Sequence, residues 1–199
     1  MTDPLVVDVW WADLTAADLR LLTLLPEPER LRVLAVPRDA DRGRSLVAAA
    51  LLQHAVARHR RRAAGSAGAA PADLTPVQVD RTCAGCGEQH GRPVVDGGPH
   101  VSVAHAHLLV AVATCAGASL GVDVERLDRD LPDGSDPLGW TLREARVKAG
   151  VEVGAAACET PLTPPLPGYA AALVLAPVAA GSAADDVDLE VREHRWHPG

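Results

Sequence analysis

Apolar residues recur along the chain in short runs, several of which alternate with polar residues as strands do. The run GVDVER, for example, places Val122 and Val124 on one face of a strand and the residues between them on the other. Six such runs predict strands, at residues 5–12, 75–81, 100–115 (one strand or a pair), 120–126, 169–179 and 187–196.

Three other segments have the spacing of helices. Residues 14–25 carry leucines at helical spacing and stop before a proline, and residues 140–153 open as a helix. The clearest helix is predicted over residues 39–62, because aspartates at its start and arginines at its end suit the helix dipole. Segments rich in Gly, Pro and polar residues separate these elements, at 63–73, 83–93, 127–139 and 160–168.

The order of helices and strands predicts an α+β fold. The runs VDVWWADL at 7–14 and VDVERLDRDL at 122–131 both begin Val-Asp-Val, and each leads toward a helix. This echo predicts two similar lobes, an N-terminal lobe of residues 1–119 and a C-terminal lobe of residues 120–199.

Composition narrows the class of protein. The chain has 199 residues, of which 48% are hydrophobic, enough for one domain or for two small lobes that share a core. A net charge of −7 argues against a nucleic-acid binder, and no apolar run is long enough to span a bilayer. The N-terminal residues lack the pattern of a signal peptide, and four cysteines are too few for a disulfide scaffold, so we expect a cytoplasmic protein.

Asp123 and Glu125 are the first candidates for chemistry. They lie two residues apart on a predicted strand, so they share a face and their charges repel each other. Water, a cation or a metal ion must compensate this repulsion, and a hard cation such as Mg²⁺ prefers oxygen ligands of this kind. Taken alone, the pattern is most often an amphipathic strand with one wet face.

The predicted helix that follows carries Trp140, Glu144 and Lys148 at spacing i, i+4 and i+8, which places them along one stripe. Glu144 is therefore a candidate third carboxylate for the same metal ion. Lys148, the only lysine of the chain, is a candidate phosphate ligand. A Glu–Lys pair at this spacing is usually a surface pair worth roughly a few tenths of a kcal/mol. The two patterns together favour a site for phosphoryl transfer.

These motifs resemble those of the Sfp-type 4′-phosphopantetheinyl transferases. In that family G-[IV]-D-[IV]-E is followed by W-[ST]-x-K-E-[AS]-x-x-K-x-x-G, and this chain has GVDVE at 121–125 and WTLREARVKAG at 140–150. A family strand that ends in Ser-His corresponds to HVSVAHA at 100–106, and a Gly-[Lys/Arg]-Pro turn corresponds to GRP at 91–93. The four elements occur in the family's order, and with the helix at 41–62 the resemblance extends over most of the chain.

The resemblance implies a fold and an activity. The fold is α+β, with two pseudo-symmetric α/β lobes, and coenzyme A binds in the cleft between them. The enzyme transfers the 4′-phosphopantetheine arm of coenzyme A to a serine of an acyl or peptidyl carrier protein, in a Mg²⁺-dependent reaction that releases 3′,5′-ADP. Family members of this size are mostly monomers, which is the expectation for this chain.

The resemblance also implies roles for single residues. Asp123, Glu125 and Glu144 correspond to the Mg²⁺ ligands. Glu144, directly or through a water, corresponds to the base that takes the proton of the serine hydroxyl, and Lys148 to a ligand of the pyrophosphate. Further contacts with coenzyme A are implied for His105 (a phosphate), Arg92 and Pro93 (adenine and 3′-phosphate) and Arg44 (a further phosphate).

Three departures from the family pattern keep a second interpretation open. Arg143 replaces the lysine that usually precedes the motif glutamate, and Ala104 replaces the serine before the motif histidine. Only 14 residues separate Glu125 from Trp140, where the family has a longer segment with an aromatic-rich helix that shapes the carrier-protein side of the site. The alternative is a non-catalytic relative that binds coenzyme A or a carrier protein.

A metal-dependent nuclease is given less weight. Such enzymes also combine Asp, Glu and Lys, but usually with Glu and Lys two residues apart on a strand. Here Glu144 and Lys148 are four apart on a predicted helix, and the net charge is acidic.

Two further patterns are expected to be structural. Cys83 and Cys86 form a C-x-x-C pair with His90 nearby, but a zinc site needs four ligands and no second C-x-x-C or H-x-x-H pair is present, so we expect a plain turn with two thiols. The basic run at 58–62 is expected to be a solvated helix end, with contact to an acidic carrier protein as the alternative.

Overall fold

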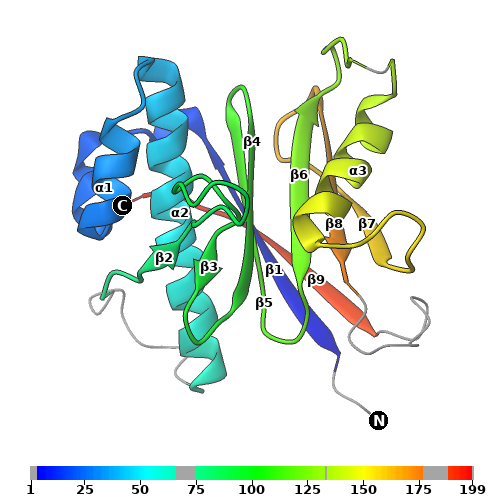
Figure 1. The fold of residues 1–199 in the computed structure, drawn as a ribbon, viewed down its shortest axis with the longest axis horizontal. Coiled ribbons are helices and arrows are strands. Elements are labelled where there is room, and N and C mark those ends of the chain that lie inside the picture. Colours follow the sequence, from blue (N-terminus) through cyan, green and yellow to red (C-terminus); the bar gives the residue numbers. More distant parts are fainter. Residues whose placement is uncertain (1–3, 66–74, 133, 177–187, 199) are drawn as a thin grey trace.

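The computed structural model describes residues 4–65, 75–132, 134–176 and 188–198. Over these residues the chain is a mixed α+β protein (Figure 1). Two larger sheets share a core of apolar side chains, and each sheet carries a helix on its other face. The α+β class is therefore as the sequence predicts.

The first sheet has the strand order β4-β5-β1-β9. Its members are β1 (Leu5–Asp13), β4 (His100–Ala106), β5 (Leu109–Cys115) and β9 (Leu189–Arg195). β1 is antiparallel to β5 and parallel to β9, so the end of the chain returns to the sheet in which the chain begins. Trp10 and Trp11, adjacent on β1, lie in different cores: Trp10 against α2 (Asp39–Ala63) and Trp11 against the second sheet.

The second sheet has the order β6-β8-β7 and is antiparallel throughout. Its members are β6 (Leu120–Arg126), β7 (Cys158–Leu162) and β8 (Tyr169–Leu175). Val122 and Val124 of β6 face the core that the two sheets share. The helix α3 (Pro137–Ala149) covers the opposite face, where Ala145 and Ala149 pack against Val174.

Smaller elements surround α2. The 3₁₀-helices η1 (Leu14–Ala16) and η2 (Leu19–Leu24) and the helix α1 (Glu27–Leu34) follow β1. A two-stranded ribbon of β2 (Val79–Asp80) and β3 (Val94–Val95) leads into β4.

The edge strands of the two sheets, β4 and β6, meet along a seam (Figure 1). Across this seam the backbone N–H of Val122 donates to the hydroxyl of Ser102 at 3.0 Å. The boundary expected between residues 119 and 120 falls in the connection between β5 and β6, while the C-terminal segment also supplies β9 to the first sheet. The two Val-Asp-Val runs occupy different places, because β1 is an inner strand and β6 an edge strand.

Several elements confirm the sequence prediction. The long helix and the strand at 120–126 have nearly the predicted bounds. The apolar run at 100–115 is a pair of strands, joined by a tight turn in which His107 has a φ of 47°. The strand predicted at 169–179 ends at Leu175, and residues 177–179 lie outside the described part of the chain.

The helix predicted at 14–25 is wrong, because this segment forms two short 3₁₀-helices. The side chains of Asp13 and Asp18 accept the backbone N–H groups of Thr15 and Arg20, so each aspartate begins a new turn. The helix α1, which begins directly after Pro26, was not predicted.

Three other boundaries differ from prediction. The strand predicted at 75–81 is reduced to β2, because the buried side chain of Gln53 takes both backbone hydrogen bonds of Val77. β7 overlaps a segment predicted as irregular, since an edge strand tolerates Pro161. The helix α3 begins at Pro137, earlier than predicted, because Asp136 caps it. None of the described helices combines the length and the apolar character needed to cross a bilayer.

Candidate active site

Asp123 and Glu125 lie on the face of β6 that α3 covers, together with Gly121. The two carboxylates are 8% and 6% exposed. Val122 and Val124, which alternate with them, lie in the core shared by the two sheets. The two acidic side chains thus share one face, as expected from their spacing, but this face is nearly dry instead of wet.

The place of α3 depends on a glycine. A Cβ on Gly121 would overlap the carbonyl oxygen of Ala145 and lie 2.7 Å from the backbone nitrogen of Ala149. The helix backbone therefore rests directly on β6, which only glycine permits at this position. Glu144 and Lys148 flank this contact, so the close approach brings both side chains over the carboxylates of the strand.

Lys148 is the central cation of the site. Its ammonium donates to Oδ1 of Asp123 at 2.7 Å, to the carbonyl of Val122 at 3.2 Å and to the carbonyl of Val103 at 3.4 Å. Val103 lies on β4 and Val122 on β6, so one side chain of α3 contacts the edge strands of both sheets.

The pKa of Asp123 depends on the charges of the other two expected metal ligands. Burial raises the pKa of Asp123 above its usual value, and the charge and hydrogen bond of Lys148 oppose this shift. The negative charges of Glu144 and Glu125 raise the pKa of Asp123 further. These three carboxylates therefore act on one another across a small volume beside Lys148.

Glu125 is engaged by two groups of its own segment. Arg129 forms an ion pair with one carboxylate oxygen, and the backbone N–H of Arg126 donates to the other at 2.9 Å. Arg129 was not expected at the site from sequence. In a strand, a residue four positions after Glu125 would lie too far away to contact it. The chain turns after β6, and this turn brings Arg129 back to Glu125.

The donor set fits Mg²⁺ by its chemistry, because three carboxylates are the ligands that a hard cation prefers. Their oxygens do not all come within 4.8 Å of one another, since the one set of Asp, Glu, His and Cys ligands this close among the described residues lies elsewhere. Asp123 and Glu125 each bind a cationic side chain instead. A metal ion here would take the place of Lys148 and Arg129 on these carboxylates.

Two expected phosphate ligands come from the first sheet and α2. The guanidinium of Arg44 pairs with Asp41 and donates to the carbonyl of His107 at 3.2 Å. His105 lies on the neighbouring strand β4, on the side opposite to Ser102. Loss of water around its imidazole lowers the pKa of His105, and the positive charges of Arg44 and Lys148 lower it further. Arg44 on α2 and Lys148 on α3 thus both lower the pKa of His105.

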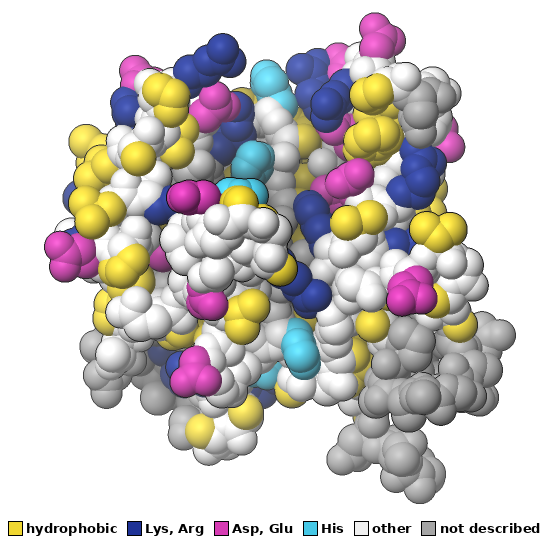
Figure 2. Space-filling model, in the orientation of Figure 1, with side chains coloured by type: hydrophobic (Ala, Val, Ile, Leu, Met, Phe, Trp, Pro, Cys, Tyr) yellow, Lys and Arg dark blue, Asp and Glu magenta, His cyan; other side chains and the backbone are white. Residues whose placement is uncertain are grey.

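Arg92 and Pro93 lie beside the C-terminal end of α3. One Nη of Arg92 donates to the hydroxyl of Ser119 at 2.9 Å, and Ser119 donates in turn to the carbonyl of Ala149 at 2.7 Å. A hollow of about 450 Å³ opens here, lined by Arg92, Pro93, His100 and Ser119 among others. Figure 2 shows basic and histidine side chains along the line where the two halves of the molecule meet, with acidic side chains beside them.

The structure therefore brings most of the expected residues to the seam between β4, β6 and α3. Ala104 is buried toward β6, in the core that the two sheets share. Ser102 and Ser119, which bind across the seam, were not expected from sequence, because their contacts join segments far apart in the chain. A larger cavity of about 760 Å³ lies between α2, the 3₁₀-helices and the C-terminal residues, and none of the expected site residues lines it.

Comparison with protein-family models finds no family that matches the chain, and comparison with curated proteins finds no significant match.

Proposed function

We propose that the chain is a 4′-phosphopantetheinyl transferase that moves the phosphopantetheine arm of coenzyme A to a serine of an acyl or peptidyl carrier protein. The observation that supports this most directly is the position of Lys148. It lies 2.7 Å from Asp123, a carboxylate on which Glu125 and Glu144 also act. A lysine among three carboxylates is suited to hold a diphosphate together with a divalent cation.

The surrounding cations suit an elongated, anionic substrate. Arg92 lies at the C-terminal end of α3, Lys148 is in the last turn of this helix, and His105 and Arg44 lie across the seam. We assign the 3′-phosphate and adenine to Arg92 and Pro93, and the diphosphate to Lys148, His105 and Arg44. Mg²⁺ held by the three carboxylates would neutralise the charge that develops on the leaving diphosphate oxygen.

The chemical step needs one base. The hydroxyl oxygen of the carrier serine attacks the phosphorus that bears the pantetheine, and the bond from this phosphorus to the bridging oxygen breaks. The electron pair of that bond leaves with 3′,5′-ADP. Glu144, directly or through a water, accepts the serine proton. It is half-buried on α3, and none of the hydrogen bonds or ion pairs that the structure describes engages it.

Binding without turnover is the second candidate function, and one observation favours it. The protein's own cations engage two of the three proposed metal ligands, Lys148 on Asp123 and Arg129 on Glu125. A chain that keeps these ion pairs when coenzyme A is bound would hold the substrate but would not assemble the metal.

Intact-mass spectrometry separates the two functions. Several apo carrier proteins are incubated with the chain, coenzyme A and Mg²⁺, and the intact mass of each carrier is measured. The gain of one phosphopantetheine group supports the transferase, and EDTA and Asp123→Ala should both abolish it. Glu27→Ala, which removes an exposed carboxylate on α1, away from β6 and α3, is the control that should keep activity. No gain on any carrier, with coenzyme A still bound in calorimetry, would leave the binding function.

A further inference from the structure

The segment 81–93, which joins β2 to β3, brings three potential metal ligands together. The sulfurs of Cys83 and Cys86 and one ring nitrogen of His90 all lie within 4.8 Å of one another. Sγ of Cys86 is 3.0 Å from Nε2 of His90. Cys86 and His90 are exposed, so the group is open to an ion from solvent.

The backbone of this turn orients both sulfurs. Gly87 has a φ of 79°, which glycine adopts without strain, and its N–H donates to the carbonyl of Cys83 at 2.8 Å. The N–H of Cys83 in turn donates to the carbonyl of Glu88 at 2.8 Å. These backbone hydrogen bonds close the turn that carries Cys83 and Cys86.

We propose that Cys83, Cys86 and His90 bind one Zn²⁺ ion. Two thiolates and an imidazole are ligands that zinc prefers, and on a tetrahedral zinc such atoms lie roughly 3.5–3.8 Å apart. The three ligand atoms here all lie within 4.8 Å of one another, so small side-chain adjustments would bring them to this spacing. Among the described residues no other Asp, Glu, His or Cys belongs to this group. The fourth position would therefore be taken by water or by a ligand from outside this group. The proposal differs from the plain turn expected from sequence, because three protein ligands and one open position also form a zinc site.

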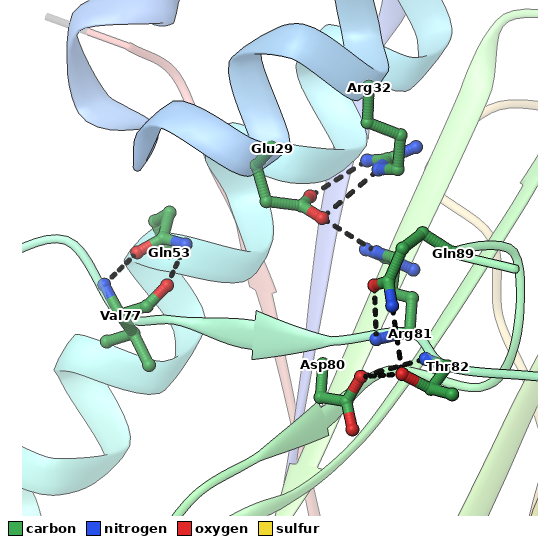
Figure 3. Close-up of polar contacts among 8 residues, drawn as sticks. All are labelled: Glu29, Arg32, Gln53, Val77, Asp80, Arg81, Thr82 and Gln89. Atoms are coloured by element: carbon green, nitrogen blue, oxygen red, sulfur yellow. Dashed lines mark hydrogen bonds and ion pairs between the residues drawn. The ribbon is translucent and has the colours of Figure 1, made fainter. Parts of the chain in front are cut away.

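The base of the segment is fixed without an ion (Figure 3). Arg81 donates to the buried carboxylate of Glu29 on α1 at 3.0 Å, and Gln89 receives the N–H of Arg81 and donates to Thr82. These contacts hold residues 81, 82 and 89 in place. The tip of the segment, which carries Cys83 and Cys86, is held only by hydrogen bonds within its own turn among the contacts that the structure describes. Zn²⁺ would tie the two ends of the tip, Cys83 and His90, to each other.

By fixing this segment, the ion would also fix the backbone that leads into Arg92. Gly91 follows His90 directly, and a Cβ at Gly91 would lie 2.8 Å from the carbonyl of Thr82 and 2.9 Å from that of Arg81. Its N–H donates to the carbonyl of Arg81 at 2.6 Å. The two sides of the segment are thus in backbone contact immediately before Arg92, so the shape of the tip bears on the position of that arginine. This structural role does not depend on the proposed transferase activity.

The test is a Zn²⁺ titration of the full chain, stripped by chelator and kept reduced, against a chromophoric competitor. We expect one Zn²⁺ per chain and, after Co²⁺ substitution, the absorption bands of thiolate-bound tetrahedral cobalt. Cys86→Ser should weaken binding by about 100-fold or more, since even groups that only support a metal ligand are worth 10–100-fold. Cys158→Ser, at a cysteine outside the group, is the matched control and should bind like the unsubstituted chain.

The same samples give a second measurement that does not depend on activity. Zn²⁺ should raise the melting temperature of the unsubstituted chain and of Cys158→Ser, and it should leave that of Cys86→Ser unchanged. Circular dichroism of Cys86→Ser checks that the variant is folded. Equal zinc binding by Cys86→Ser and the unsubstituted chain would overturn the proposal. So would the absence of binding in the reduced chain, for example where the two thiols serve only as a reversible Cys83–Cys86 disulfide.

Discussion

The ammonium of Lys148 lies 2.7 Å from the Asp123 carboxylate and closes the seam between the two sheets. Its other acceptors are the carbonyls of Val122 on β6 and Val103 on β4. Two edge strands that do not pair with each other are thus joined through one side chain of a helix. In the absence of substrate this lysine stabilises the fold at the place where we propose that it binds diphosphate.

We predict that Lys148→Met destabilises the chain by about 1–3 kcal/mol, because it leaves the buried carboxylate of Asp123 without its counter-charge. Asp123→Asn in the same chain should recover part of this loss. Urea unfolding of the two single variants and the double variant measures the coupling between the residues. Additive effects would show that the ion pair contributes nothing to stability.

Glu144→Gln should lower the turnover number of carrier modification by roughly 100-fold or more, the usual contribution of a general base. Affinity for coenzyme A, measured by calorimetry without divalent ions, should not weaken, because the substitution removes a negative charge beside the proposed phosphate site. Glu152→Gln, at an exposed residue just after α3, is the matched control. Wild-type turnover in Glu144→Gln would remove this residue from the proposed mechanism.

Local sequence rules predict those parts of the site that lie within one element. The period of a strand places Asp123 and Glu125 on one face, and the period of a helix places Glu144 and Lys148 on one stripe. What these rules could not supply is the partner of each group. The contact of Lys148 with β4 depends on how two sheets meet, and sequence spacing carries no signal for it.

The same division applies to the fold. The strand at 120–126 was predicted well because its alternation is a local property, whereas η1 and η2 escaped prediction because short aspartate-capped turns have leucine spacing like that of an α-helix. β9 pairs with β1 although the paired residues are more than 180 positions apart in sequence, so no local pattern predicts this pairing.

Gly121→Ala tests the contact between α3 and β6. The added Cβ would overlap the carbonyl oxygen of Ala145, and helix backbone cannot yield as a flexible side chain can. We expect a loss of about 3 kcal/mol or more in the free energy of unfolding, together with a loss of any activity that needs Lys148 and Asp123 aligned. Gly85→Ala is the control, because its nearest neighbour would be 3.8 Å away, and it should change stability by less than about 0.5 kcal/mol. Equal effects would mean that the helix can move aside.

The buried position of His54 leads us to predict how stability depends on pH. Its ring lies edge-on against Trp10, with centroids 4.7 Å apart. Burial lowers the pKa of His54 to about 4, and the positive charges of Arg58, Arg61 and His194 act in the same direction. The unfolded chain therefore takes up this proton at a higher pH than the folded chain does. Stability from this group is complete above the ordinary pKa of about 6.5 and is lost as pH falls from there toward 4.

Each ten-fold difference in proton affinity corresponds to about 1.4 kcal/mol, so the loss from His54 amounts to roughly 3 kcal/mol at most. We expect His54→Leu to be less stable than the unsubstituted chain at pH 7.5, because it loses the ring contact with Trp10, and to lose less stability on acidification to pH 4. Denaturant unfolding at a series of pH values measures both effects. Parallel curves for His54→Leu and the unsubstituted chain would show that this histidine is protonated equally in the folded and unfolded states.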